Sequence, residues 1–204
     1  MQDKKFITIS GNIGIGKSTL TKKLAEHYKF KPYLEQDVKN PYLEDFYKNM
    51  KRWAFHSQMF FLSKRLEDHY QLVVDKDSVV EDRSIYENAE VFARYCYQRG
   101  FISKREWKTY QRVYQTCKNI LPAPDLIVYL RASTETILRR LKSSGRKIEK
   151  NINKKYIEDI NKLYDKWAGN FDLAQVVIIN YDDLDLKNRS VDFYSFLESL
   201  EKFF

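Results

Sequence analysis

The sequence contains little that would mark a secreted, metal-stapled or membrane protein. Its 204 residues include only two cysteines, Cys96 and Cys117, and three histidines, so we expect neither a disulfide framework nor a zinc site. No segment approaches the ~20 apolar residues that a membrane span needs. The short apolar run near Met1 ends at Gly11, which is too short for a signal peptide. We therefore expect a cytoplasmic protein with two reduced thiols and no membrane partner.

Glycine and proline are also scarce, with six and four residues, and no run of five like charges occurs. The net charge of +8 permits nucleic acid, but it equally permits an anionic ligand such as ATP. Because Lys and Arg are interspersed with Asp and Glu, we favour a solvated surface with one phosphate site over a nucleic-acid groove. A chain of this length buries roughly 70% of its surface on folding, so we expect one domain over residues 1–204.

Short runs rich in Val and Ile alternate with long helical patterns, and this order predicts a three-layer α/β fold with a five-stranded parallel sheet. The expected strands are Phe6–Ser10, Pro32–Glu35, Ser78–Asp82, Asp125–Leu130 and Gln175–Asn180. The expected helices are Lys17–Tyr28, Tyr42–Tyr47, Lys51–Val74, Ile85–Gln98, Lys104–Asn119, Ser133–Ser144, Asn153–Ala168 and Ser190–Phe203.

Half of the glycines lie within six residues, in a segment that matches the phosphate-binding pattern GxxxxGK[ST] in full. A predicted strand precedes the segment and a predicted helix follows it, which is the context that the pattern requires. Backbone N–H groups of such a loop face an anion, while Lys17 reaches the outer phosphates and Ser18 binds Mg²⁺. The residues expected to bind ATP are Gly11, Asn12, Ile13, Gly14, Ile15, Gly16, Lys17, Ser18 and Thr19.

Carboxylates stand at the ends of two predicted strands, where open α/β sheets bind their ligands. Glu35 ends the second strand and Asp82 ends the third, so either can orient Mg²⁺ or accept a proton. Taken alone, Glu35 also fits a surface carboxylate. Gln58 and Arg65 share one face of a long predicted helix and suit the polar edge of a base, although a solvated rim explains them as well.

Basic residues flank Gly145 at the end of another predicted helix, from Arg139 to Lys147. In a phosphoryl-transfer enzyme, such a cluster is a lid that neutralises the charge of the moving phosphoryl group. The alternative is a basic helix end that interacts favourably with the helix dipole.

Five ordered segments of the chain, between Phe6 and about Trp167, resemble the deoxyribonucleoside kinases, and the deoxyadenosine kinase branch of bacteria most of all. The segments are Gly11–Thr19, Glu35 with Asn40–Tyr47, Trp53–Gln58 with Arg65, Asp82–Tyr86, and Arg140–Glu149. The resemblance implies a P-loop kinase fold with a helical lid at about residues 140–152. It also implies transfer of the γ-phosphoryl group of ATP to a deoxynucleoside 5′-hydroxyl with Mg²⁺.

The same resemblance implies roles around the reacting hydroxyl and the sugar. Glu35 matches the carboxylate that takes the proton from the 5′-hydroxyl, and Arg83 matches the arginine that holds both groups. Asp82 matches the acid near Mg²⁺. Tyr47 and Glu149 match the pair that binds the sugar 3′-hydroxyl.

Further matches concern the base and the lid. Gln58 matches the amide that hydrogen-bonds the base, Arg65 a base-site arginine, Phe92 a ring that stacks on the base, and Trp53 a pocket wall. The lid arginines of the family fall at Arg140 and Arg146.

The chain departs from the family at three places. Asp37 lies in a Glu-Gln-Asp sequence where many relatives have Glu-Pro-Val, and Ser144 replaces a second lid arginine. Asn88 occupies a position where many purine-using relatives have a base-facing aspartate. We expect deoxyadenosine to be the favoured substrate, followed by deoxyguanosine or deoxycytidine.

Two other classes of protein also contain a P-loop and are alternative interpretations of the sequence. A nucleoside monophosphate kinase of the thymidylate type needs a second basic site for the acceptor phosphate, which fits poorly with Glu35 and Glu149. A non-catalytic module that binds ATP would not need the acceptor-side matches at all. The family resemblance further implies a homodimer, for which the aromatic-rich segments Ile85–Tyr97 and Lys104–Tyr114 are candidate faces.

Overall fold

The runs predicted as strands form one parallel sheet in a computed structural model that describes residues 4–34, 40–143, 152–184, 189–201 and 203. The strands of this part of the chain are β1 (Phe6–Gly11), β2 (Lys31–Tyr33), β3 (Val79–Asp82), β4 (Leu126–Arg131) and β5 (Gln175–Asn180). Their order in the sheet is β2-β3-β1-β4-β5, and every pair is parallel. The central strand β1 is buried along its whole length, which explains its uninterrupted apolar character.

Helices join the strands, and most of their boundaries agree with the predicted ranges to within one or two residues. The longer helices are α1 (Lys17–Tyr28), α3 (Met50–Val74), α6 (Lys104–Ile120), α7 (Thr134–Ser143), α8 (Lys154–Ala168) and α9 (Ser190–Glu201), and the shorter ones are α2 (Leu43–Lys48), α4 (Ile85–Glu87) and α5 (Arg94–Gln98). The predicted three-layer α/β fold is confirmed. Glu35 and Gly145, which were expected to end a strand and a helix, lie outside the described residues.

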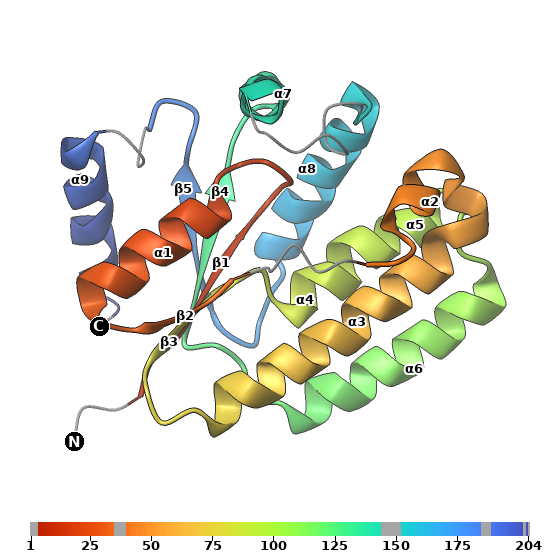
Figure 1. The fold of residues 1–204 in the computed structure, drawn as a ribbon, viewed down its shortest axis with the longest axis horizontal. Coiled ribbons are helices and arrows are strands. Elements are labelled where there is room, and N and C mark those ends of the chain that lie inside the picture. Colours follow the sequence, from red (N-terminus) through yellow and green to blue (C-terminus); the bar gives the residue numbers. More distant parts are fainter. Residues whose placement is uncertain (1–3, 35–39, 144–151, 185–188, 202, 204) are drawn as a thin grey trace.

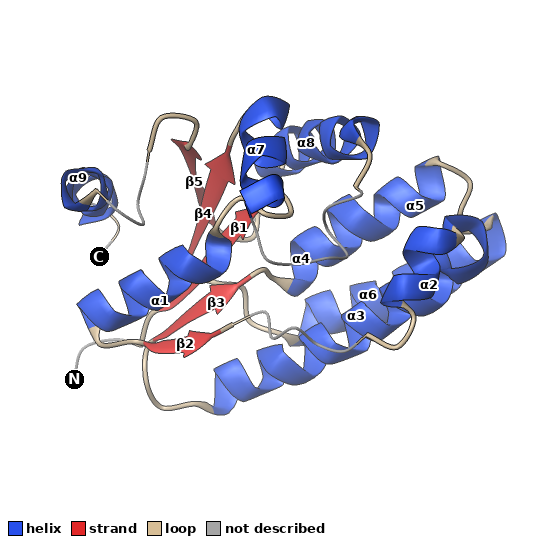
Figure 2. Ribbon diagram, turned by 45° about the horizontal axis from the view of Figure 1, so that its top comes forward, coloured by secondary structure: helices blue, strands red, loops and turns tan. Residues whose placement is uncertain are grey.

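The helices are distributed on both sides of the sheet (Figures 1 and 2). The first helix, α1, packs on β1, β2 and β3, whereas α8 lies against β4 on the other side. The carboxyl ends of the parallel strands point toward the loop that enters α1 and toward α7 and α8 (Figure 1). Ligands of open α/β sheets bind at this edge.

The segment predicted as one helix over 85–98 is interrupted. A single turn, α4, is followed by the π-helix η1 (Asn88–Ala93), and α-helical geometry resumes in α5. A π-helix adds one residue per turn and so changes the direction in which the following side chains point. The prediction of a continuous helix was wrong because its apolar pattern carries no signal for this extra residue.

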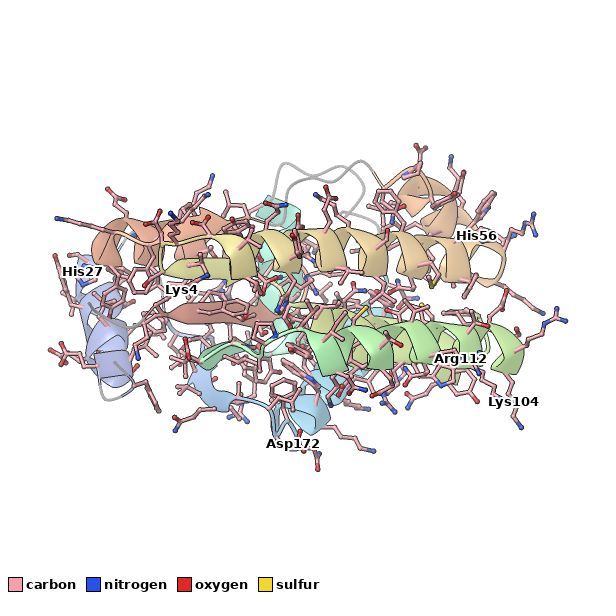
Figure 3. The ribbon with its side chains drawn as sticks, turned by 90° about the horizontal axis from the view of Figure 1, so that it is seen from below. Lys4, His27, His56, Lys104, Arg112 and Asp172 are labelled. Carbon is pink, nitrogen blue, oxygen red and sulfur yellow. The ribbon has the colours of Figure 1, made fainter. Side chains whose placement is uncertain are left out.

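On the face away from the P-loop, α3 and α6 lie side by side (Figure 3). Charged side chains such as Lys104 and Arg112 extend from α6 into solvent. In contrast, the segment from α4 to α5 is buried in the core over most of its length, so this candidate dimer face is occupied by core packing. Within the described parts of the chain, no helix combines the length and apolar character that a bilayer crossing requires.

Candidate active site

The loop between β1 and α1 has the backbone that only glycine adopts easily. Gly14 and Gly16 have φ of 72° and 109°, and this left-handed region is strained for other residues. A Cβ atom on Gly14 would lie 2.3 Å from Cδ2 of Leu141 in α7, and one on Gly11 would lie 2.9 Å from the carbonyl oxygen of Leu130. The loop is therefore pressed against α7 and β4, with no space for a larger residue at these two positions.

Side-chain hydrogen bonds anchor the same loop to α8. Asn12 is buried, and its Nδ2 donates to the carbonyl oxygen of Ile157 at 3.1 Å and to Oδ1 of Asn161 at 2.7 Å. Its Oδ1 accepts from the N–H of Ile13 at 2.7 Å. Lys17 is 5% exposed, and its Nζ donates to the carbonyl oxygen of Asn12 at 3.1 Å, so the amine lies over the loop.

Ser18 and Asp82 bring two oxygen ligands together beside the loop. The Ser18 hydroxyl donates to Oδ2 of Asp82, which is fully buried at the carboxyl end of β3. The other oxygen, Oδ1, is buried without a hydrogen-bond partner among the described residues. A hydroxyl and a carboxylate with an unused oxygen suit Mg²⁺, which takes few protein ligands and keeps waters and phosphates in the others. The donor set therefore fits this ion.

Arg83 follows Asp82 in a strained conformation, with φ of 71°. Its N–H donates to the carbonyl oxygen of Ile9 at 3.0 Å, which continues the pairing of β3 with β1. Its guanidinium is buried, donates from Nη1 to the Tyr164 hydroxyl at 3.0 Å and lies 4.5 Å from the centre of the Phe92 ring. Such strain persists only where the surroundings hold it, and it is concentrated at functional sites.

Two polar side chains of α3 face the core near the end of β3. Arg65 is 5% exposed and donates from Nη1 to the carbonyl oxygen of Asp82 at 3.1 Å, so it supports the end of β3. Gln58 is 4% exposed, and its Oε1 has no partner among the described residues. Five residues before Gln58, Trp53 stacks on Tyr42 with ring centroids 5.8 Å apart.

The other predicted acceptor residues lie on neighbouring elements. Phe92 in η1 packs its ring edge against Tyr164, below the guanidinium of Arg83. Asn88 is buried, and its Nδ2 lies 3.4 Å from the Tyr110 hydroxyl of α6. Tyr47 in α2 is partly buried against the core. The structure thus brings Arg83 and Phe92 together, while it ties Asn88 to α6.

Arg140, predicted as a lid arginine, bridges two loops. Its Nη1 donates to the carbonyl oxygen of Ile15 in the P-loop at 2.8 Å. Its Nη2 donates at 3.1 Å to the carbonyl oxygens of Tyr181 and Leu184, which follow β5, and the guanidinium lies 4.1 Å from the Tyr181 ring centre. The other lid and sugar residues of the prediction, Arg146 and Glu149, lie outside the described residues, as do Glu35 and Ser144.

Next to the site lies a buried carboxyl group, Glu81, whose pKa is raised. Glu81 precedes Asp82 and is almost completely buried; burial raises the pKa of its carboxyl from about 4.5 to about 8, partly offset by the positive charge of Arg65. Its Oε2 accepts from the Thr8 hydroxyl at 3.1 Å, and its Oε1 has no partner within the described chain. Glu81 is therefore largely protonated in the folded protein at neutral pH.

Two residues of this region were missed by the sequence analysis. Glu87 is fully buried under the P-loop, and Tyr164 connects it to Arg83. Ser84 and Glu87 form a capping box, whose Ser-x-x-Glu pattern was available as a signal for the start of α4. No pattern in the sequence distinguishes Tyr164 from the other tyrosines of the chain.

Comparison with known proteins decides the family. The deoxynucleoside kinase profile matches residues 7–204. The chain belongs to the deoxynucleoside kinase family. It is 38% identical to the deoxyadenosine/deoxycytidine kinase of Bacillus subtilis over 185 residues, which cover 90% of this chain and 85% of the relative. It is 36% identical to the deoxyguanosine kinase of the same organism, over 81% of this chain and 79% of the relative.

A solved structure agrees with this assignment. The deoxyadenosine kinase of M. mycoides, determined with the products dCMP and dCDP, has a TM-score of 0.82 to this deoxynucleoside kinase at 27% identity, over 96% of this chain and 98% of the other. The same enzyme was also determined with bound dATP, at a TM-score of 0.80. The chain is accordingly a phosphotransferase that uses a nucleoside triphosphate as donor and a deoxynucleoside as acceptor.

Proposed function

We propose that this deoxynucleoside kinase phosphorylates deoxyadenosine in preference, then deoxyguanosine or deoxycytidine, with Mg-ATP as the donor. The observation that carries the proposal is the convergence of the P-loop residues Lys17 and Ser18 with Asp82 and Arg83 at one edge of the sheet. This arrangement combines a phosphate cradle with a cation and a carboxylate on the acceptor side.

In the proposed mechanism, the P-loop holds the triphosphate and Lys17 neutralises charge on its outer phosphates. Ser18 and Asp82 would hold Mg²⁺, which would supply positive charge to balance the phosphates. The Ser18 hydroxyl contact to Asp82 supports this pairing, because both oxygens already lie within reach of one ion. The P-loop contact of Arg140 supports a role in fixing the loop that faces the donor.

On the acceptor side, Arg83 orients the 5′-hydroxyl and Glu35 accepts its proton. Phosphoryl transfer has a loose transition state, so positioning contributes more than the strength of the base. The buried guanidinium of Arg83, fixed over Phe92, supports the orienting role. The role of Glu35 rests on the sequence pattern, as do the contacts of Tyr47 and Glu149 with the sugar and of Arg146 with the phosphates.

The proposed preference for deoxyadenosine has two supports. The buried amide of Gln58 offers an acceptor and a donor in either order, so it can pair with the exocyclic amine and ring nitrogen of adenine or of cytosine. The relative at 38% identity is named for deoxyadenosine and deoxycytidine, which share this amine. Arg65, Trp53 and Asn88 complete the proposed base-side wall.

We also propose that the enzyme is a cytoplasmic homodimer. Both cysteines are unpaired and buried, as in reducing compartments. Exposed apolar side chains on the adjacent helices α3 and α6 support the proposal; they are Tyr70, Val73, Val74, Val113 and Ile120. Light scattering on the purified chain measures the mass directly, and a mass of one chain at micromolar concentration would contradict the dimer.

A phosphate-transfer panel tests the substrate proposal. The protein is incubated with Mg-ATP and separately with each of the four deoxynucleosides, adenosine and dTMP, and the phosphorylated products are quantified. We expect the highest kcat/KM for deoxyadenosine and little product from adenosine. A higher kcat/KM for deoxyguanosine would contradict the proposed preference for deoxyadenosine, and turnover of dTMP alone would indicate a monophosphate kinase.

A further inference from the structure

A buried carboxylate lies between the start of the P-loop and the acceptor side. Glu87 has no exposed surface, and four donors converge on its two oxygens. Oε1 accepts from the Ser10 hydroxyl and from the N–H of Ser84, both at 2.9 Å. Oε2 accepts from the N–H of Gly11 at 3.4 Å and from the Tyr164 hydroxyl. Glu87 thus contacts the first glycine of the P-loop directly.

The Tyr164 hydroxyl connects this carboxylate to Arg83. It donates to Glu87 and accepts from Nη1 of Arg83 at 3.0 Å. The Tyr164 ring is held independently, because it stacks on Tyr129 with centroids 5.4 Å apart and meets the edge of Phe92 at 5.9 Å. The hydroxyl is therefore a fixed point between a carboxylate and a guanidinium.

We propose that Glu87 and Tyr164 are positioning residues for phosphoryl transfer, which hold the guanidinium of Arg83 in register with the start of the P-loop. The proposal rests on the role of Arg83 in the proposed function. Neither residue touches the reacting atoms. They act through two other residues: Arg83 on the acceptor side and Gly11 on the donor side.

The direction of the hydrogen bonds explains why a tyrosine is suited to this place. A phenol has one proton, and once that proton is donated to Glu87, only lone pairs face Arg83. Burial raises the pKa of the Tyr164 hydroxyl well above its usual range, so it stays protonated as the pH varies. The guanidinium needs such an anchor because φ of 71° at Arg83 is an unfavourable conformation that the surroundings must maintain.

Tyr164→Phe tests the proposal, because it removes the hydroxyl and keeps the ring contacts. We expect kcat to fall by about 10–100-fold, the scale of a displacement of about 1 Å in a positioning group. Because the residue contacts neither substrate, KM for the deoxynucleoside and for ATP should stay within about threefold. A kcat within twofold of the wild type would overturn the proposal.

Tyr114→Phe is a matched control. Tyr114 is equally buried, and its hydroxyl donates to Glu90, which is one turn beyond Glu87 and away from the P-loop. Both variants lose a hydroxyl–carboxylate hydrogen bond of a buried tyrosine, although the Glu90 carboxylate is partly exposed, so both melting temperatures should fall. Only Tyr164→Phe should lower kcat. An equal loss of kcat in both variants would indicate a general effect on folding and contradict the proposal.

A double-mutant cycle with Arg83→Lys identifies the route of the effect. If Tyr164 acts through Arg83, adding Tyr164→Phe to Arg83→Lys should change kcat by less than threefold, whereas independent effects multiply in full. Glu87→Gln repeats the test from the other end, and we expect the same 10–100-fold loss. An unchanged kcat in Arg83→Lys would refute the role of Arg83 itself, while an active Tyr164→Phe would refute only this inference.

Discussion

The donor and acceptor sides of the site differ in how their buried polar groups are satisfied. In the P-loop region, Asn12, Lys17 and Arg140 all bond to protein atoms of the loop or of its neighbours. Asp82 at the end of β3 and Gln58 in α3 each keep one buried oxygen without a partner among the described residues. The side chains around the P-loop thus find partners within the protein, whereas the two side-chain oxygens of Asp82 and Gln58 do not.

The unpartnered oxygens affect the free energy of folding. An unsatisfied buried polar group costs about 1–3 kcal/mol, and that amount is recovered when a ligand provides the missing partner. Stability and function therefore oppose each other at the two unpartnered side-chain oxygens. Substitutions in the two regions should separate these effects.

The largest effect is expected on the donor side from Lys17→Ala. The amine already lies over the loop, so its loss removes a preorganised cation from the phosphates. We expect kcat to fall by about 10²–10³-fold, the usual scale for one electrostatic group in a transition state. Steady-state kinetics with deoxyadenosine and Mg-ATP measures it.

Lys22→Ala is the control for this variant, since Lys22 lies on the same helix α1 but is exposed. It should retain the kcat of the wild type. If Lys17→Ala and Lys22→Ala had the same kcat, the contacts of Lys17 in the P-loop would not matter for catalysis.

The next effect concerns the stability of the acceptor side and its dependence on pH. The raised pKa of Glu81, about 8, means that the folded state keeps a proton which the unfolded chain releases near pH 4.5. The contribution of Glu81 to the free energy of unfolding is then greatest below about pH 4.5 and is lost as the pH rises toward 8. Glu81→Gln keeps an acceptor for Thr8 and removes this loss.

Relative to the wild type, Glu81→Gln should therefore gain about 1 kcal/mol of unfolding free energy per pH unit between pH 5 and 8. Urea titrations at four pH values measure the difference. Glu67→Gln, which alters an exposed carboxylate of α3, should follow the wild type across this range. Parallel curves for Glu81→Gln and the wild type would show that Glu81 is ionised in the folded protein.

The same comparison explains how much the sequence could predict. The P-loop is a continuous segment with fixed spacing, so its residues and its helix α1 were predicted with correct boundaries. The five parallel strands followed from their apolar runs. The strand ends carrying Asp82 and Arg83 followed as well, because parallel strands finish at one edge.

The contacts that complete the site depend on three-dimensional packing and were not predicted. Tyr164 is 81 residues from Arg83 in the chain, and only the crossing of α8 over the sheet brings their side chains together. The π-helix η1 likewise has no counterpart in the apolar pattern. The contact between the amide of Asn88 and the Tyr110 hydroxyl of α6 was not predicted either.

The smallest effect should come from Gln58→Met, which tests whether the unmatched oxygen exists for the base. Met has a similar length and no strong hydrogen-bonding group, so it removes the unsatisfied Oε1 without a large change of volume. We expect the free energy of unfolding to rise by about 1 kcal/mol, measured by urea titration without ligand. In the same variant, kcat/KM for deoxyadenosine should fall about tenfold, since one hydrogen bond to the base is lost.

Leu62→Met, one turn further along α3 and in the core, changes an apolar side chain and should leave kcat/KM unaltered. A Gln58→Met protein that is less stable than the wild type would mean that the amide is satisfied without substrate, and the two sides of the site would then not differ.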